Sequence, residues 1–299
     1  MPVTDVGFPS TLAQALQAAA ALGVDRLDAR LLLLHAIGRS THERAWLVAH
    51  DTDALVADHW HAYAVLCGRR AANEPVAYLT GEKEFHGLRL QVDARVLVPR
   101  PDTETLVDWA LDVLAGQASP TVLDLGTGSG AIALALQHAR PDASVDAVDA
   151  SADALVVARA NAVRLGLPVV FIESDWFAGI GACGVRDGIV SGNDDAGSYR
   201  LIVSNPPYIA ANDAHLPALR HEPSSALGAG PDGLSDLRRI VQDAPAHLAE
   251  GGWLLLEHGH DQDAAVRALL LARGFAEVQS RDDLAGIARC SGGIWRTVK

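Results

Sequence analysis

Hydrophobic residues are spaced differently in successive parts of the chain, and the first part has a helical period. Between residues 10 and 80, apolar positions recur every three or four residues, as in "STLAQALQAAAALG" and "DRLDARLLLLHAIG", and both runs end at a glycine. This spacing and these end signals are typical of amphipathic helices. The sequence therefore predicts a small all-α domain over residues 1–81.

In the next segment, "FHGLRLQVDARVLVPRP", the period changes to two. Apolar residues alternate on either side of Asp93 and Ala94, at Leu88, Leu90, Val92, Val96 and Val98. Alternation around a short polar turn indicates a β-hairpin. We therefore expect a hairpin linker over residues 82–100, with its turn at Asp93 and Ala94.

From residue 101 to residue 299, short apolar runs alternate with helix-patterned segments. The strand-like runs are "TVLDLG", "SVDAVDA", "PVVFIESDWF", "LIVSNPP" and "GGWLLLEHG". Such alternation predicts an α/β domain with a mostly parallel sheet and helices on both faces. The last segment, "FAEVQSRDDLAGIARCSGGIW", predicts a terminal antiparallel pair of strands. Residues 179–198 are rich in Gly, Asp and Ser, which predicts a long surface loop.

Composition narrows the class of protein. The chain has 299 residues, of which 49% are hydrophobic and 20% charged, as in ordinary globular proteins. A formal net charge of −13 disfavours a protein that holds long nucleic acid through its phosphates. Apolar stretches such as residues 31–34 are shorter than the ~20 residues of a membrane span, and the N-terminus lacks a signal-peptide pattern. We expect a cytoplasmic protein with neither a membrane nor a direct nucleic-acid partner.

The sequence gives little support for a metal site. Cys67, Cys183 and Cys290 are far apart, which suggests neither a disulfide framework nor a zinc site. In "EHGH", His258 and His260 lie near the end of a strand, but no third ligand stands at a suitable spacing. We therefore expect no metal cofactor.

A glycine-rich turn connects a strand and a helix in "LDLGTGSGAIALAL", residues 123–136. Such a turn lets the backbone N–H groups at a helix N-terminus approach a ligand closely. The glycines follow the pattern GxGxG, whereas the dinucleotide fingerprint is GxGxxG, so the turn favours a nucleoside with an amino-acid tail over a pyrophosphate. The candidate residues of the turn are Gly126, Thr127, Gly128, Ser129 and Gly130.

Acidic and aromatic residues follow the next two strands. Asp149 ends the second strand, where its carboxylate could accept hydrogen bonds from both hydroxyls of a ribose. The third strand is expected to end in Asp175 and Trp176, suitably placed for the edge and face of an adenine. A structural alternative stays open: the glycines could serve only tight packing, and Asp149, followed by Ser151, could be a helix cap.

The segment "SNPPY", residues 204–208, ends the fourth strand, because two prolines cannot continue a hydrogen-bonded ladder. The Asn205 side-chain oxygen and the Pro206 carbonyl can accept the two hydrogen bonds of an NH₂ group, and Tyr208 can pack on the planar group that bears it. In a doubly wound sheet this strand and the strand before the glycine turn flank the topological switch point. The loop is therefore expected to orient a planar amine or amide in the same crevice.

These motifs resemble known families. "LDLGTGSG", "AVDAS", "SDWF" and "SNPPY" resemble class I S-adenosylmethionine-dependent methyltransferases that act on planar nitrogen. "EPVAYLTGEKEFHGLRLQVDARVLVPRPDTETLVDWAL", "EPSSAL", "DGLSDLRRI" and "GGWLLLEHGHDQ" are similar to the PrmC/HemK family of release factor glutamine N5-methyltransferases. The resemblance covers nearly the whole chain, although residues 179–198 form a longer segment than is usual in the family.

The resemblance implies a Rossmann-like fold with a mostly parallel seven-stranded sheet, an antiparallel terminal pair and a helical substrate-recognition domain. It also implies an enzyme of translation termination that uses S-adenosyl-L-methionine to methylate the glutamine of the GGQ motif in class 1 peptide chain release factors.

The resemblance also implies roles for individual residues. Cofactor contacts are implied for Gly126 to Gly130, Asp149, Trp176 and Asn205. Catalytic roles are implied for Asn205, Pro206 and Tyr208, and substrate contacts for Asn205, Pro206, Pro207 and Tyr208. Pro99, Arg100 and Glu104 are expected to line the site from the hairpin side, although an Arg/Glu pair at a helix start is an equally good structural interpretation.

Two other functions stay open. A nucleic-acid (adenine or guanine) N-methyltransferase would share the NPPY motif, but the acidic charge disfavours it. A non-catalytic cofactor-binding partner of translation would not need the Asn205 and Tyr208 side chains.

Overall fold

The computed structural model describes residues 8–180, 199–214 and 216–297. Most of the predicted loop at 179–198 therefore lies outside the described residues. By its internal contacts the chain divides into two compact units, Met1–Glu82 and Lys83–Lys299. Each unit is described by itself.

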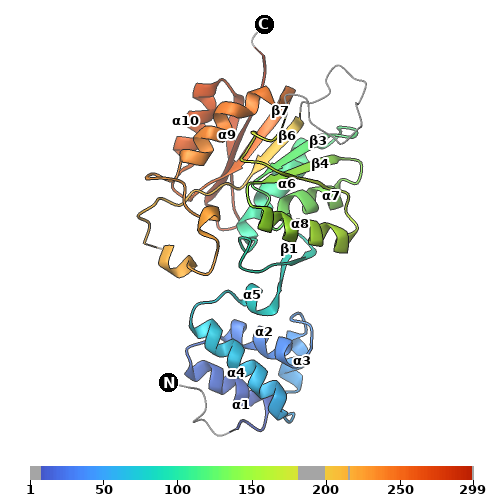
Figure 1. The fold of residues 1–299 in the computed structure, drawn as a ribbon, viewed down its shortest axis with the longest axis vertical. Coiled ribbons are helices and arrows are strands. Elements are labelled where there is room, and N and C mark those ends of the chain that lie inside the picture. The colour runs from blue at the N-terminus through green and yellow to red at the C-terminus, as the bar shows by residue number, and fades with distance from the viewer. Residues whose placement is uncertain (1–7, 181–198, 215, 298–299) are drawn as a thin grey trace. The chain divides into compact units, whose positions relative to one another are not determined.

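The first unit is helical, as predicted (Figure 1). Side chains cap two of its helices, because the Thr11 hydroxyl accepts from the Gln14 N–H and the Asp25 carboxylate accepts from the Leu27 N–H. Leu32, Leu33, Leu47, Trp60 and Tyr63 are among the residues of its core. The helices are α1 (Leu12–Ala21), α2 (Arg26–Ala36), α3 (Arg44–Ala49), α4 (Ala57–Ala71) and α5 (Val76–Thr80).

A hairpin opens the second unit, but its turn is not where the sequence predicted it. Strands β1 (Glu82–Phe85) and β2 (Leu88–Gln91) are joined by His86 and Gly87. Both turn residues have positive φ, +47° and +78°, as the favoured two-residue hairpin turn requires. The prediction of a turn between strands at Asp93 was wrong, since Asp93 closes only a local loop by accepting from the Val96 N–H.

The second unit contains the predicted seven-stranded sheet. Its order is β5-β4-β3-β6-β7-β9-β8, with the first five strands parallel and β9 antiparallel to both neighbours. The third strand of the sheet in chain order ends at Glu173, so Asp175 and Trp176 lie beyond its end and the predicted strand end was wrong. Trp176 has a φ of +51°, which an extended strand does not allow. The strands are β3 (Thr121–Leu125), β4 (Ser144–Asp149), β5 (Val170–Glu173), β6 (Tyr199–Ser204), β7 (Leu248–Glu257), β8 (Ala276–Asp282) and β9 (Ala288–Ile294).

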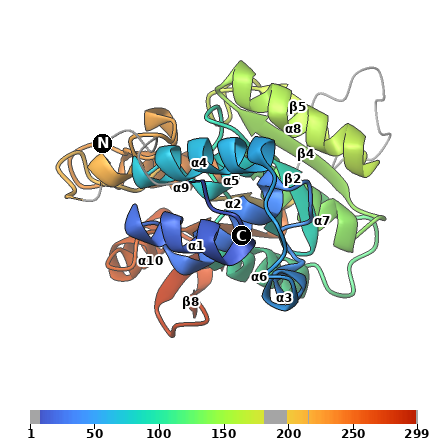
Figure 2. The same cartoon turned by 90° about the horizontal axis from the view of Figure 1, so that it is seen from below.

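Helices cover both faces of this sheet (Figures 1 and 2). One core contains residues of α6 (Glu104–Val113), α7 (Ala131–Ala139) and α8 (Ala152–Leu165), and the other contains residues of α9 (Ser235–Asp243) and α10 (Asp263–Arg273). Strands β3 and β6 are neighbours, and the chain order reverses between them. Their carboxyl ends therefore flank the topological switch point, where α/β sheets bind ligands.

Short 3-10 helices complete the second unit: η2 (Pro101–Thr103), η3 (Leu216–Leu219), η4 (Ser224–Ala226) and η5 (Ala244–Ala246). None of the described helices combines the length and the apolar character that crossing a bilayer requires.

Candidate active site

The glycine turn after β3 depends on backbone conformations that side chains rarely allow. Gly126, Gly128 and Gly130 have φ values of +71°, +56° and +84°. A Cβ on Gly126 would lie 3.3 Å from the Trp176 ring, and one on Gly130 would lie 3.0 Å from a methyl carbon of Leu134. The turn therefore needs glycine both for its conformation and for its close packing.

A buried carboxyl group supports this turn from beneath. Asp124 accepts hydrogen bonds from the Thr127 hydroxyl at 2.7 Å and from the Ala133 N–H at 3.2 Å. Burial raises the pKa of Asp124 to about 7. Asn161 of α8 also supports the turn, because its Nδ2 donates to the Ser129 carbonyl at 3.0 Å. Thr127 and Ser129 are buried.

Asp149 combines a supporting role with a place at the cavity. Its Oδ2 accepts from the Gly128 N–H at 2.8 Å, and its Oδ1 accepts from the Ser151 N–H at 2.9 Å. Ser151, not Asp149, is the N-cap of α8, since its hydroxyl accepts from the Ala154 N–H. Each carboxylate oxygen can accept a further hydrogen bond. Burial raises the pKa of Asp149.

The segment after β5 contributes an aromatic wall. The Trp176 indole donates from Nε1 to Asp236 of α9 at 3.3 Å, and Asp175 pairs with Arg239 of the same helix at 2.8 Å. Sequence reasoning did not assign roles to Asp236 or Arg239. Their only signal was the segment "DGLSDLRRI", which entered through the family resemblance.

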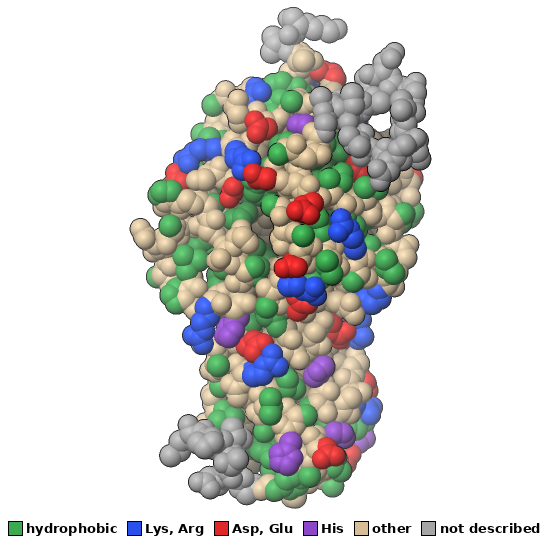
Figure 3. Space-filling view, viewed as in Figure 1, with side chains coloured by type: hydrophobic (Ala, Val, Ile, Leu, Met, Phe, Trp, Pro, Cys, Tyr) green, Lys and Arg blue, Asp and Glu red, His purple; other side chains and the backbone are tan. Residues whose placement is uncertain are grey.

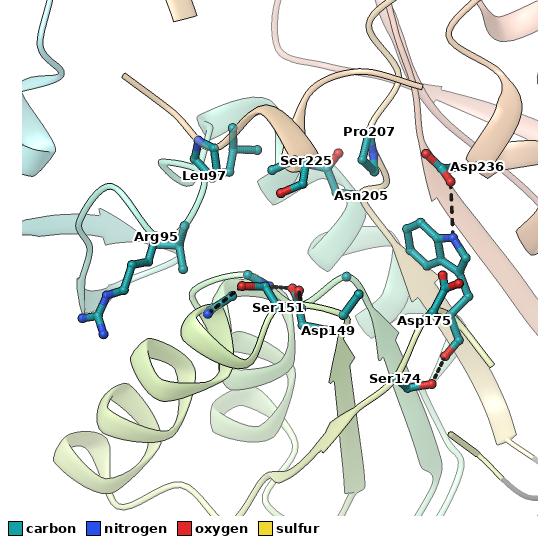
Figure 4. Close-up of a pocket in the computed structure, with 18 of the residues that line it drawn as sticks. Arg95, Leu97, Asp149, Ser151, Ser174, Asp175, Asn205, Pro207, Ser225 and Asp236 are labelled. Carbon is teal, nitrogen blue, oxygen red and sulfur yellow. Dashed lines mark hydrogen bonds between the residues drawn. The ribbon is translucent and has the colours of Figure 1, made fainter. Parts of the chain in front are cut away.

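A cavity of about 380 Å³ lies at the carboxyl ends of the strands. This volume is within the usual range for small-molecule sites. Figure 4 shows Asp149 and Ser151 on one wall and Asn205, Pro207 and Ser225 on the opposite wall. Of the predicted site residues, those that line the cavity are Gly126, Gly128, Asp149, Trp176, Asn205 and Pro207, whereas Thr127, Ser129, Gly130, Pro206 and Tyr208 are not among its lining residues.

The loop after β6 is held by hydrogen bonds from other elements. The Asn205 side chain donates from Nδ2 to the Thr103 hydroxyl at 3.2 Å. The Tyr208 hydroxyl donates to Glu257 Oε1 at 3.4 Å, and the Tyr208 carbonyl accepts from Gln262 Nε2 at 3.1 Å. Burial, followed by the charge of Glu257, raises the pKa of Tyr208. Sequence reasoning missed Thr103 and Glu257, because they precede and follow the loop by many residues.

The sequence left two interpretations open for Arg100 and Glu104, contact with the site or a structural Arg/Glu pair, and the structure gives both side chains other partners. Arg100 forms a salt bridge with the buried Glu222, which also accepts from the Val98 N–H at 3.1 Å. Glu104 accepts from the His86 N–H at 3.1 Å and so supports the hairpin turn. Pro99, Arg100 and Glu104 are not among the residues that line the cavity. The bonds of Arg100 and Glu104 instead hold neighbouring segments of the chain.

The part of the chain that the structure describes contains no group of three or more His, Cys, Asp or Glu residues that could hold a metal ion. Both ring nitrogens of His258 have hydrogen-bond partners, Gly259 O at 2.9 Å and Ser291 Oγ at 2.8 Å. Burial lowers the pKa of His258. Cys67 and Cys290 are buried free thiols, and Cys183 lies outside the described residues.

Comparisons with known proteins agree with this architecture. Residues 10–81 match the model of the PrmC N-terminal domain, and residues 103–222 match that of the methyltransferase small domain. A solved structure, the T. thermophilus 16S rRNA N2 G1207 methyltransferase in complex with AdoMet and guanosine, is 19% identical, with a TM-score of 0.50 over 72% of this chain and 50% of that chain. This likeness shows the fold alone.

Curated relatives are much more similar. The release factor glutamine methyltransferase of Burkholderia pseudomallei is 49% identical, over 95% of this chain and 96% of the relative. That of Bordetella pertussis is 51% identical, over 91% of this chain and 95% of the relative. These matches confirm the resemblance found in the sequence, and this chain belongs to the family of release factor glutamine methyltransferases.

Proposed function

We propose that this protein transfers a methyl group from S-adenosyl-L-methionine to the side-chain amide nitrogen of the GGQ glutamine in class 1 peptide chain release factors. The observation that carries the proposal is the shared cavity. It brings the glycine turn and Asp149 together with Asn205, from the ends of adjacent strands, in a chain whose relatives are release factor glutamine methyltransferases.

The residues at the cavity fit S-adenosyl-L-methionine. Gly126 and Gly128 leave the backbone open to the amino-acid tail, and Asp149 keeps acceptor capacity for the ribose hydroxyls. Trp176 supplies an aromatic face for the adenine. When bound, the cofactor supplies a methyl group that is already activated on a sulfonium.

The protein's own task is then to present the substrate nitrogen. An amide nitrogen is a poor nucleophile, because its lone pair is delocalised into the carbonyl. The Asn205 Oδ1 and the Pro206 carbonyl would accept the two N–H groups of the glutamine, while Tyr208 packs on its amide plane. Acceptors placed in this way favour a pyramidal nitrogen and hold it in line for transfer.

Transfer of a labelled methyl group tests the proposal. Purified protein and labelled S-adenosyl-L-methionine are incubated with an intact class 1 release factor, with the same factor carrying alanine in place of the GGQ glutamine, and with cellular RNA. We expect label in the unaltered factor alone. Equal labelling of the two factors, or preferential labelling of RNA, would contradict the proposed substrate.

A further inference from the structure

The orientation of the Asn205 amide decides whether the cavity meets a hydrogen-bond acceptor or a donor. In the structure, Nδ2 donates to the Thr103 hydroxyl, which lies at the end of η2. Oδ1 is the other branch of the same amide and is left for the cavity that Asn205 lines. An NH₂ substrate needs that acceptor, whereas a flipped amide would confront it with a second NH₂ group.

The Thr103 hydroxyl can keep this orientation only if its own proton points elsewhere. A hydroxyl has one proton and two lone pairs, so it accepts from Asn205 when it donates to another group. Glu257, at the end of β7, is the group that fits this role, because a hydrogen bond from the Thr103 side chain helps to lower the pKa of its carboxyl. The Tyr208 hydroxyl donates to Glu257 as well. The Glu257 carboxyl therefore acts on two residues of the NPPY loop, on Tyr208 directly and on Asn205 through Thr103.

Glu257 is placed to act as an acceptor. Its side chain is buried, with a residue exposure of 1%, and its Oε2 has no hydrogen-bond partner among the described residues. A buried carboxyl with spare acceptor capacity costs stability, because burial disfavours its charged form, so its presence here calls for a functional explanation.

We propose that Glu257 is a positioning residue which, through the Thr103 hydroxyl, holds the Asn205 amide with Oδ1 toward the substrate nitrogen. The proposal rests on the proposed function and deepens it. Glu257 does not touch the substrate; it sets the direction of the Thr103 proton, and Thr103 sets the direction of the Asn205 amide.

The ionisation of Glu257 gives the arrangement a pH dependence. Burial, as the largest cause, and the nearby charge of Asp102 raise the pKa of Glu257, whereas hydrogen bonds from Thr103 and Tyr208 and the charge of Arg289 on β9 lower it. The net result is a pKa of about 7. Its neighbour on β9, Cys290, is a buried thiol whose own pKa is raised by burial and by Glu257.

A protonated Glu257 can donate to Thr103, whose proton is then free to turn toward Asn205 and to favour the flipped amide. The turnover number kcat is therefore expected to fall as the pH falls through the pKa of Glu257.

Two variants of Thr103 provide the first test, with an intact release factor as substrate. Thr103→Val removes the hydroxyl and keeps the shape, whereas Thr103→Ser keeps the hydroxyl. At about pH 8 we expect Thr103→Val to lower kcat by about 10- to 100-fold, with the Kd for S-adenosylhomocysteine unchanged, and Thr103→Ser to stay within about threefold of the wild type. Wild-type kcat in Thr103→Val would overturn the proposal.

The pH profile separates positioning from mere structural support. Wild-type kcat is expected to rise between about pH 6 and about pH 8, and this rise should disappear in Thr103→Val and in Glu257→Gln. The kcat of the double variant Thr103→Val/Glu257→Gln should be no more than about threefold below that of the less active single variant, because both changes break the same connection from Glu257 through Thr103 to Asn205. If Thr103→Val keeps the wild-type pH dependence, the route through Thr103 is wrong. Failure of the wild type to methylate the factor at any pH would instead contradict the proposed function.

Discussion

At the scale of single residues, the candidate site relies on side chains that serve the backbone and the cavity at once. Asp149 holds the Gly128 and Ser151 N–H groups in place while facing the cavity. Because these bonds pre-position the carboxylate, a ligand need not order it on binding. Asn205 also has two roles, because its Nδ2 donates a hydrogen bond to the Thr103 hydroxyl while the residue lines the cavity.

Asp149→Ala is expected to weaken the binding of S-adenosylmethionine and S-adenosylhomocysteine by about 1–3 kcal/mol, because the ribose hydroxyls lose their acceptor. Isothermal titration calorimetry measures the change. Asp153→Ala, which removes an exposed carboxylate from the first turn of α8, is the matched control and should bind as the wild type does. Unchanged affinity in Asp149→Ala would contradict the ribose assignment.

Asn205→Ala is expected to lower kcat by about 100-fold or more while leaving the melting temperature nearly unchanged, because the lost acceptor is needed only to align the reacting nitrogen. Single-turnover methyl transfer and thermal unfolding measure the two effects. The exposed Asn212, changed to alanine, serves as the control. Wild-type turnover by a folded Asn205→Ala protein is the outcome that rejects this role.

The raised pKa values of Asp124 and Glu257, both about 7, make stability depend on pH. Since both values exceed those of the unfolded chain, the folded state binds more protons between about pH 4 and pH 7, and these groups' contribution to stability is lost as the pH rises through that window. Glu257→Gln removes one of them. Relative to the wild type, the variant should gain on the order of 1–3 kcal/mol of unfolding free energy between about pH 5 and pH 8.

Urea denaturation of both proteins at the two pH values provides the measurement. A difference in unfolding free energy that does not change with pH would show that Glu257 has a similar pKa in the folded and unfolded chains. The expected result has a functional corollary: the ionised carboxyl that orients Thr103 reduces stability near neutral pH.

At the scale of elements, the glycine turn that connects β3 to α7 packs closely against α7 and α8. Gly130 has a φ of +84°, and its position is crowded by Leu134 and Ala158. Gly166, which ends α8, has a similar φ of +67° but open space where a Cβ would stand. A comparison of substitutions at Gly130 and Gly166 can therefore distinguish the cost of backbone strain from the cost of steric crowding.

Gly166→Ala should cost about 1 kcal/mol of unfolding free energy, from the left-handed conformation alone. Gly130→Ala should cost clearly more, because the new methyl group must also displace Leu134. Urea denaturation at one pH compares the two variants. Equal losses would mean that the turn relaxes without cost, and that crowding does not explain the glycine at position 130.

At the scale of the whole molecule, surface charge agrees better with a protein substrate than with nucleic acid. The net charge is −13, and several arginines are already paired with carboxylates, as in Arg95–Asp93, Arg238–Asp232 and Arg239–Asp175. Figure 3 shows acidic and basic side chains next to one another on the face that it presents. Such pairing leaves less positive charge for the phosphate contacts that dominate nucleic-acid affinity.

A glutamine side chain alone offers too little contact to select one residue in a cell, so selection must use surface outside the NPPY loop. We propose that the helical unit, whose residues 10–81 match the PrmC N-terminal domain, supplies it. The full-length protein is then expected to methylate an intact release factor with a kcat/KM at least about tenfold above that for a short GGQ peptide. An equal kcat/KM for both substrates would mean that the NPPY loop alone recognises the substrate, and would contradict a role for the helical unit.

The sequence by itself determined the features that depend on neighbouring residues. Helical spacing predicted the first unit, the alternation of strands and helices predicted the sheet, and the paired prolines marked the end of β6 at Ser204. The ends of β3 and β4 followed from the glycines and Asp149 in the same way, because glycine and proline restrict or release the backbone wherever they stand.

Only the tertiary structure decided which side chains meet. Asn205 bonds Thr103, Trp176 bonds Asp236, and Arg100 pairs with Glu222 rather than with the nearby Glu104. Each of these pairs joins segments that are far apart in the chain. Periodicity describes the face on which a side chain lies, but not its partner across the sheet. The folded sheet brings these distant segments to its carboxyl edge, where buried polar groups must satisfy one another.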